Sequence, residues 1–587
     1  MLALVLFASA CGSSADEAVT GAVDEVEDVV TGDGEGDNGA MEEDADDSGM
    51  EEDADDGAME EDADDGAMEE DADDGAMEED ADDGPVYGGT LTALLEAESD
   101  TWEIPGANCA VSCITVMRTV AEPLTIVNDA GEVEPFLLET YETNDDFTEY
   151  TLTLRDGITF HDGTAADGAA MQRSLQEMAQ GLLQGQVLVD LVDGPDSIEL
   201  VDDMTVKLTF SRPYATFGYN IAERTGWLIA PSYWDDPERA AALMVGTGPF
   251  KMVEWTRGEQ TVVEKNDDYW RTDADGNALP YLDEIVFRPV PDVSTRLATM
   301  EAGDADYNMD SFGENSAFWE GEWLDNGGRL LVPSDDRETT YLMFNNAAPP
   351  FDDPQVRRAL AHCSDRDEYM AFRAPNDTLA NGPFAKGALG YLDDTGFPQF
   401  DAEEGNRIFD EIGRPELITY GTTNVPSNLL TAELFVDMWS KNCGLNVEID
   451  QFDQSELITK AITGAFEVFL WRNHGQGNPG LEFVWWHSRH ASGLALNFGR
   501  IIDEDIDASL EQIWATTDEG ELDSLAQDIN RKFGSEVYNM WLNTTEWANP
   551  YQPNVHGVGV LDTPSGNRAQ TGVAGRSWLS QAWKDAS

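Results

Sequence analysis

Basic residues are scarce in this chain of 587 residues, which has 32 Lys and Arg against 118 Asp and Glu and a formal net charge of -86 at pH 7. Proteins that bind nucleic acid neutralise the phosphate backbone with clustered Lys and Arg. The composition therefore argues against a nucleic-acid partner. We interpret the acidity as a solvated surface suited to a saline habitat, because net charge governs solubility and long-range repulsion.

Recognisable catalytic motifs are also missing. The sequence contains no GxSxG elbow, HExxH helix, Walker loop or dinucleotide-binding glycine fingerprint. Acidic residues are so frequent that a glycosidase-like carboxylate pair is not excluded, but no spacing signals one. His161 stands between two Asp-Gly turns without a paired nucleophile, so we interpret it as a structural residue. We expect a protein that is not an enzyme, with a secreted hydrolase as a distant alternative.

Long apolar runs are lacking too, since a bilayer-spanning helix needs ~20 apolar residues. The N-terminal MLALVLFASACGSS has a short apolar run from Leu2 to Phe7, then small residues and Cys11. This order is typical of a lipoprotein signal peptide, although the basic segment usual before the apolar run is missing. Either the chain starts further upstream or the likeness is accidental. We predict a signal peptide over residues 1–11 that ends at a lipidated Cys11.

An acidic segment follows over residues 12–84. It contains 34 acidic residues and no Lys or Arg, which leaves 84 acidic and 32 basic residues for the rest of the chain. Near copies of MEEDADDGA begin at Met41, Met50, Met59, Met68 and Met77. Each copy has one sizeable apolar side chain and cannot offset the entropy of ordering. We predict a disordered, self-repelling spacer rather than a calcium site, because the glycine of DADDG does not stand at the sixth position of an EF-hand loop.

The remaining body has the pattern of an α/β protein. Its ~500 residues predict two or more domains. Leu152 and Leu154 alternate with polar residues in TLTLRDGITF, which predicts a half-buried strand. Asp353 and Pro354 mark a helix start. A later helix that ends at Gly444 runs into another alternating strand, and this mixed order favours sheets covered by helices.

Four phrases carry a family resemblance. They are YTLTLRDGITFHDGTAADGAAMQRSL (150–175), VGTGPFKMVEWTRGEQTVVEKNDDYW (245–270), YLDEIVFRPVPDVSTRLATMEAGDADY (281–307) and YLMFNNAAPPFDDPQVRRALAHCSDRDEY (341–369). In this order they resemble the bacterial extracellular solute-binding proteins that serve peptide, opine, nickel and oligosaccharide ABC importers. The resemblance covers nearly everything after the acidic segment.

The resemblance implies a two-lobed periplasmic-binding-protein-like fold of class II, of the large type with an extra inserted subdomain. We expect lobe 1 at residues 85–330, with the insertion at about 118–240, and lobe 2 at 331–538. The C-terminal residues 539–587 would return to lobe 1. The ligand would bind in the cleft between the lobes and be enclosed by hinge closure.

Cysteine use agrees with an exported protein. Apart from Cys11, the chain has Cys109, Cys113, Cys363 and Cys443, an even number. We predict one disulfide between Cys363 and Cys443, because both end helices in the implied second lobe, and another between Cys109 and Cys113. Zinc binding is the alternative, but the CxxxC spacing has no matching second pair.

The candidate ligand-binding residues lie mainly in 466–500, which in the family lines the cleft from the second lobe. We assign Trp471, Arg472, Asn473, His474, Asn478 and Trp485, together with Trp102. Peptide-binding members place an aspartate shortly after the tryptophan, where it pairs with the ligand's α-ammonium. Here no carboxylate follows Trp471 before Pro479, so another group, Glu96 or Glu98, would have to hold an ammonium.

Three ligand classes therefore remain open. Aromatic faces beside amides suit sugars as well as peptides. His474, His487 and His490 raise a nickel-chelate reading, although surface imidazoles are the simpler interpretation. We expect a monomeric, lipid-anchored extracytoplasmic receptor, without cofactor or metal, that delivers a peptide-like solute to an ABC permease and its ATPase. An oligosaccharide is the alternative ligand.

Overall fold

The computed structural model describes residues 84–107, 111–181, 185, 188, 191–192, 194–311, 313–332, 338–473, 477–545, 547–573 and 575–586. The predicted signal peptide, Cys11 and nearly all of the predicted acidic spacer lie outside these residues, as does Cys109 of the predicted Cys109 to Cys113 bond. These remain predictions. All of the described residues belong to one compact unit of the chain.

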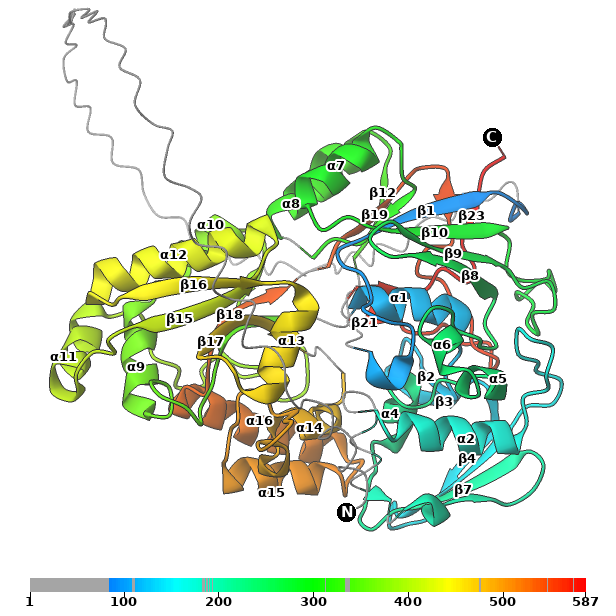
Figure 1. Ribbon diagram of the computed structural model, residues 1–587, viewed down its shortest axis with the longest axis horizontal. Helices are drawn as coiled ribbons and strands as arrows, with labels where there is room; N and C mark the ends of the chain where they lie inside the picture. The colour runs from blue at the N-terminus through cyan, green and yellow to red at the C-terminus, as the bar shows by residue number, and fades with distance from the viewer. Residues whose placement is uncertain are drawn as a thin grey trace, which may run out of the picture. The chain divides into compact units, whose positions relative to one another are not determined.

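The first lobe is built on a mixed sheet with the strand order β12-β19-β11-β1-β10-β9-β8. Its central strand pairs in parallel with β10 and β11, and its residues Leu91, Ala93 and Leu95 are buried. Helix α1 (Val111–Val120) packs against β8 (Figure 1). The strands are β1 (Thr90–Leu95), β8 (Phe250–Thr256), β9 (Gln260–Lys265), β10 (Glu284–Pro289), β11 (Tyr307–Asn308), β12 (Arg329–Leu331) and β19 (Asn549–Tyr551).

A second sheet of lobe 1 has the order β4-β5-β7-β6 and lies within the expected insertion. Its strands are β4 (Leu138–Thr143), β5 (Glu149–Leu154), β6 (Ile198–Leu200) and β7 (Thr205–Thr209), and helix α2 (Gly168–Met178) packs on β6 and β7. Leu152 and Leu154 are buried, whereas Thr151 and Thr153 are partly exposed. The predicted alternation is therefore confirmed. The short helices α4 (Phe217–Glu223), α5 (Pro231–Trp234) and α6 (Pro237–Ala240) follow.

The second lobe has a six-stranded sheet of order β14-β18-β13-β17-β15-β16. Its strands are β13 (Glu338–Phe344), β14 (Thr378–Leu379), β15 (Ile418–Thr423), β16 (Val447–Phe452), β17 (Val468–Asn473) and β18 (Asn539–Thr545). Its helices are α9 (Pro354–Cys363), α10 (Arg366–Arg373), α11 (Ala402–Ile412), α12 (Pro426–Cys443), α13 (Gln454–Thr463), α14 (Phe483–Trp486), α15 (Glu504–Ile513) and α16 (Glu519–Glu536). The predicted start of α9 is confirmed, because Asp353 caps it by accepting a hydrogen bond from the Gln355 amide.

The chain passes between the two lobes twice, from β12 to β13 and from β18 to β19. We expected the return to lobe 1 to begin at residue 539, and the structure corrects this boundary. Strand β18 pairs with β13 along its length, so residues 539–545 belong to the sheet of lobe 2. The return follows β18 because β19 pairs with β11 and β12 in the first sheet.

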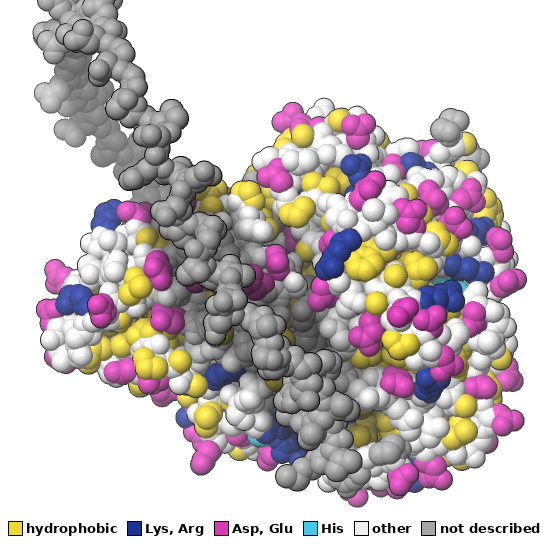
Figure 2. Space-filling model, viewed as in Figure 1, with side chains coloured by type: hydrophobic (Ala, Val, Ile, Leu, Met, Phe, Trp, Pro, Cys, Tyr) yellow, Lys and Arg dark blue, Asp and Glu magenta, His cyan; other side chains and the backbone are white. Residues whose placement is uncertain are grey.

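The acidic surplus lies at the surface of both lobes. Figure 2 shows Asp and Glu side chains scattered over the visible face, with Lys and Arg between them in smaller number. Helix N-termini use several of these carboxylates as caps, including Asp292, Asp401, Asp453 and Asp503. Side-chain oxygens there satisfy backbone amides that the first turn of a helix leaves without partners. No helix among the described residues is both long and apolar enough to cross a bilayer.

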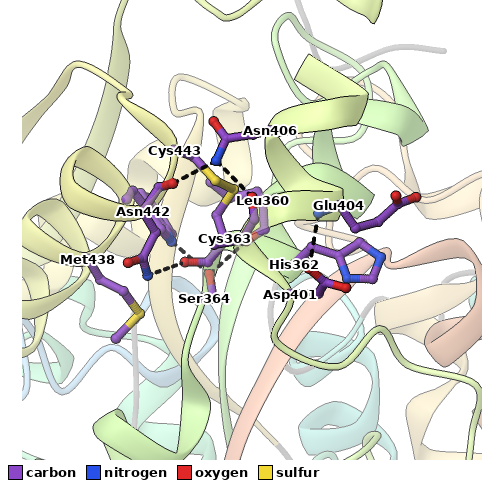
Figure 3. Close-up of a disulfide and its surroundings, with 12 residues drawn as sticks. Leu360, His362, Cys363, Ser364, Asp401, Glu404, Asn406, Met438, Asn442 and Cys443 are labelled. Atoms are coloured by element: carbon purple, nitrogen blue, oxygen red, sulfur yellow. Dashed lines mark hydrogen bonds between the residues drawn. A yellow bond between two sulfur atoms is a disulfide. The ribbon is translucent and has the colours of Figure 1, made fainter. Parts of the chain in front are cut away.

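The expected disulfide between Cys363 and Cys443 is present and joins the C-terminal ends of α9 and α12 (Figure 3). The two Cα atoms are 6.0 Å apart, and both cysteines are buried. Helix α11 passes so closely that a Cβ on Gly405 would lie 2.7 Å from the sulfur of Cys363. Asn442 donates a hydrogen bond to the Cys363 carbonyl at 3.0 Å. The bond therefore joins two helices of lobe 2, and α11 packs closely against it.

Candidate functional site

A cavity of about 580 Å³ lies between the two lobes. From lobe 1 it is lined by the loop after β1, by the first turn of α1 and by residues that follow α4. From lobe 2 it is lined by α10, by the first turns of α12 and α13, and by the end of β17. The volume falls within the range of small-molecule sites, about 300–1,000 Å³. A ligand in this cavity would contact both lobes at once.

Two tryptophans of lobe 2 give the cavity its aromatic wall. Trp471 near the end of β17 and Trp485 on α14 both line it, and each packs against Phe498, with ring centroids 5.3 Å and 5.2 Å away. The adjacent Trp486 points elsewhere and packs on Phe533 in the interior of lobe 2. Phe498 holds both lining rings in place, so a flat apolar part of a ligand would meet a preformed surface.

Arg472 lies at the centre of a charged network on the cavity wall. Its Nε is 3.0 Å from a carboxylate oxygen of Glu338, and one of its terminal nitrogens is 3.5 Å from Glu96 of lobe 1. Its guanidinium also lies over the ring of Trp547, 4.5 Å from the centroid. Burial raises the pKa of Glu338, and the charge of Arg472 opposes that rise. The charge of Arg472 is therefore balanced by two carboxylates, one from each lobe, and this residue links the two lobes.

Glu96 carries the network deeper into lobe 1. It accepts hydrogen bonds from the backbone amide and hydroxyl of Ser311, and Arg296 lies 3.5 Å away. Arg296 is 1% exposed and also lies 3.5 Å from Asp310. Burial raises the pKa of Asp310, while the charge of Arg296 lowers it. Glu96 is thus already satisfied by the protein, which weakens its role as an ammonium partner.

Arg224, which the sequence reasoning did not select, is a further residue of the cavity wall. It follows α4 in lobe 1 and is 8% exposed. Its guanidinium lies over the ring of Trp485 in lobe 2, 5.2 Å from the centroid. Burial lowers the pKa of Arg224, the charge of Glu482 opposes that fall, and the nearby Arg576 lowers the pKa further. A lone arginine after a short helix has no recognisable sequence signal.

Direct contacts between lobes continue beside the cavity. The Ala215 amide donates a hydrogen bond to the Trp514 carbonyl at 2.8 Å, and the rings of Tyr214 and Trp514 are 4.6 Å apart. Asn376 of lobe 2 donates a hydrogen bond to Ser316 of lobe 1 at 2.9 Å. The structure therefore has its lobes in contact across the cleft, beside the cavity that both lobes line.

Comparison with known proteins identifies the family. Residues 132–493, more than half of the chain, match the model of the bacterial extracellular solute-binding proteins, family 5 Middle. The chain belongs to this family. The resemblance of the four phrases is confirmed, and the mixed α/β fold with a cleft between two lobes is the fold of its solved relatives.

Curated relatives include the glutathione-binding protein GsiB of Pectobacterium atrosepticum, which is 30% identical over 288 residues, 48% of this chain and 53% of that protein. GsiB of Escherichia coli O157:H7 is 31% identical over 231 residues, 39% of this chain and 43% of the relative. The chain thus matches about half the length of these relatives or less.

Solved structures agree in fold over a longer span. DppA from Helicobacter pylori, in complex with the peptide STSA, has a TM-score of 0.73 at 19% identity and covers 85% of this chain and 99% of its own. AgaA from A. tumefaciens R10, in complex with agropinic acid, has a TM-score of 0.73 at 24% identity with the same coverage. Identity at this level supports the fold alone.

The other ligand-binding candidates of this family member do not all reach the cavity. Trp102 is 1% exposed and packs edge-on against Trp255, away from the cavity lining. Asn478 is buried because its side chain caps the short helix Pro479–Glu482, where it accepts a hydrogen bond from the Gly480 amide. His474 and the side chain of Asn473 lie outside the described residues. The roles of these four residues remain predictions.

The histidines have structural surroundings where they are described. His161 lies 2.9 Å from the Gly248 carbonyl, accepts a hydrogen bond from the Gly246 amide, and burial lowers its pKa to about 4. His487 lies 3.4 Å from Asp507 and 3.5 Å from Glu511, and burial lowers its pKa. Within the described part of the chain, no group of three or more His, Cys, Asp or Glu residues is arranged to hold a metal ion.

Proposed function

We propose that this protein is the solute-binding receptor of an ABC importer, and that it captures a small peptide-like organic solute between its lobes. The observation that carries this proposal is the cavity between the lobes, whose walls combine two aromatic rings with charged side chains from both lobes. A solute that contacts both lobes would stabilise the closed form, and a permease can recognise that form. The sequence matches to glutathione-binding proteins support a peptide-like ligand.

A receptor also accounts better than an enzyme for three of the carboxylates that line the cavity. Glu338 and Glu96 are engaged by Arg472, and Glu223 is engaged by Arg118 and Arg576 at 3.0 Å and 3.2 Å. A general acid or base must be able to transfer a proton to a substrate. Carboxylates held in ion pairs suit a binding surface with fixed charges instead.

We place this receptor outside the cytoplasm, attached to the membrane through a lipid on Cys11, where it would act as a monomer with a permease and its ATPase subunits. The acidic segment would then be the spacer between lipid and receptor. These proposals are supported by the family and by the sequence before the folded unit.

An oligosaccharide is the second candidate ligand. The stretch after Trp471, where peptide-binding members have their aspartate, carries Arg472, and the carboxylates beside it are already bound. Among the described residues of this stretch, a free α-ammonium therefore finds no unengaged carboxylate. The two tryptophans would suit a sugar ring as well as a peptide side chain.

A thermal-shift screen of the full chain against glutathione, tripeptides, oligosaccharides and nickel-histidine would test the function. We expect the melting temperature to rise with ligand concentration for a peptide-like compound, because a ligand that binds only the folded state stabilises it by mass action. A rise with oligosaccharides alone would select the second candidate. Turnover of the compound would contradict the receptor proposal.

A further inference from the structure

The two lobes also meet at a place that does not line the cavity. In lobe 1 the residue before α4 is Thr216, and in lobe 2 the short helix Pro479–Glu482 contains Gly480. Both residues are buried, and neither belongs to the cavity lining. A substitution at either position therefore changes a contact between the lobes without changing a group that faces the ligand.

On the lobe 2 side, three residues form a packed surface. Trp514 follows the end of α15 and is 1% exposed, and its ring stacks on that of Phe483 with the centroids 3.5 Å apart. Its indole Nε1 donates a hydrogen bond to the Gly480 carbonyl at 2.8 Å. We call Gly480, Phe483 and Trp514 the platform. Both contacts lie within lobe 2, so the platform does not depend on lobe 1.

Three consecutive residues of lobe 1 contact the platform. The ring of Tyr214 lies 4.6 Å from that of Trp514, and the Ala215 amide donates a hydrogen bond to the Trp514 carbonyl at 2.8 Å. Thr216 packs against Gly480 so closely that a Cβ added to this glycine would be 2.6 Å from Cγ2 and 2.7 Å from Oγ1 of Thr216. Carbon atoms in contact are normally about 3.5–4.0 Å apart. A side chain at position 480 therefore does not fit while the lobes meet in this way.

Space, rather than backbone conformation, is what requires glycine at position 480. The helix Pro479–Glu482 has a right-handed backbone that any L-residue can adopt. Rotation of Thr216 does not make room, because the added Cβ would lie close to both branches of its side chain, and a turn about χ1 leaves one branch in place. The Asn478 side chain, whose Oδ1 is 3.1 Å from that Cβ, belongs to lobe 2 and is present in any arrangement of the lobes. It is Thr216 that makes the restriction depend on closure.

We propose that Gly480 is a positioning residue for lobe closure, because its lack of a side chain lets residues 214–216 of lobe 1 pack on the platform. Contacts that no ligand touches then supply part of the stability of the closed form. The role of this contact in solute capture rests on the proposed receptor function. The apparent affinity of a receptor scales with the population of its binding-competent form. The platform therefore sets the affinity for any solute that both lobes enclose.

Hydrogen exchange at the Ala215 amide tests the contact in the full chain without any ligand, because this amide donates its hydrogen bond across the lobes. The variants are Gly480→Ala, Thr216→Ala, the two combined, and the control Gly477→Ala. Gly477 lies in the same segment but is exposed, and among the described residues a Cβ there would meet no atom within 4 Å. Exchange should be on the order of tenfold faster in Gly480→Ala than in wild type. In Gly477→Ala it should keep the wild-type rate.

Rescue by the second substitution separates closure from damage to the fold. Thr216→Ala removes both atoms that the new Cβ would meet, so the double variant should return to within about threefold of the wild-type exchange rate at Ala215. Amides of the central strands β1 and β13 should exchange at the same rate in every variant. Equal exchange at Ala215 in wild type and Gly480→Ala, a double variant without rescue, or faster exchange throughout both sheets would each overturn the inference.

Isothermal titration calorimetry with glutathione and trialanine tests the consequence for capture. For a probe that wild type binds, Gly480→Ala should weaken binding on the order of tenfold, and the double variant should recover to within about threefold. Unchanged affinity in Gly480→Ala would overturn the inference. Failure of wild type to bind either probe would count against the receptor function instead, and exchange at Ala215 would still decide whether Gly480 positions the lobes.

Discussion

The disulfide between Cys363 and Cys443 should be a major source of stability for lobe 2. It closes a loop with a sequence separation of 80 residues, for which the chain-entropy model gives ~4.5 kcal/mol of stabilisation. The loop lies entirely within lobe 2 and contains α10, α11 and α12. Replacing both cysteines with alanine should therefore lower the free energy of unfolding of this lobe by about 3–5 kcal/mol.

Urea unfolding followed by tryptophan fluorescence would measure this effect in the wild type and in the double variant. The single variant Cys363→Ala, compared with wild type in reductant, separates the loss of the bond from the loss of side-chain packing. Ligand affinity should stay unchanged well below the melting temperature, because the disulfide lies away from the cavity lining. A loss of less than about 1 kcal/mol in the double variant would refute the reasoning from loop closure.

Three other predictions concern single side chains. His161 has a folded pKa of about 4, below its ordinary value of 6.5. Its contribution to stability is therefore fully present above pH 6.5 and is lost as the pH falls toward 4. Urea titrations at pH 7 and pH 4 should show that His161→Gln reduces this loss of stability by about 2 kcal/mol. Burial raises the pKa of Glu134, but hydrogen bonds from Ser565, Asn128 and Asn567 lower it to about 2. Glu134→Gln should therefore lower the free energy of unfolding by about 1–2 kcal/mol at pH 7. The same change at the exposed Glu132 should cost little stability. Arg472→Gln should leave Glu338 buried without its ion pair and lower the melting temperature, with a cost of about 3 kcal/mol, whereas no change would contradict the proposed network.

Local sequence patterns predicted much of the fold. The alternation at Leu152 and Leu154 and the helix start at Asp353 depend on neighbouring residues, and both are confirmed. The boundary of lobe 2 was predicted less well, because strand β18 joins its sheet through pairing with a strand about 200 residues earlier. Pairing over such a distance leaves no local periodicity for the sequence to display.

In the candidate site too, the sequence predicted some residues and missed others. Trp471, Arg472 and Trp485 line the cavity, and all come from the segment that the family resemblance indicated. Arg224 was not selected from the sequence, and Trp102 is buried outside the cavity lining, because burial beside a cavity depends on how the lobes meet. Composition identifies an arginine or a tryptophan, but only the tertiary contacts show whether it faces a ligand or the core.

Native mass spectrometry of the full chain, purified without denaturation, tests most directly whether this family member encloses a small solute. We predict one small peptide-like solute bound per chain, retained in the intact protein and released on unfolding. An intact protein that carries no small molecule, and gains none when incubated with glutathione or trialanine, would contradict the receptor account.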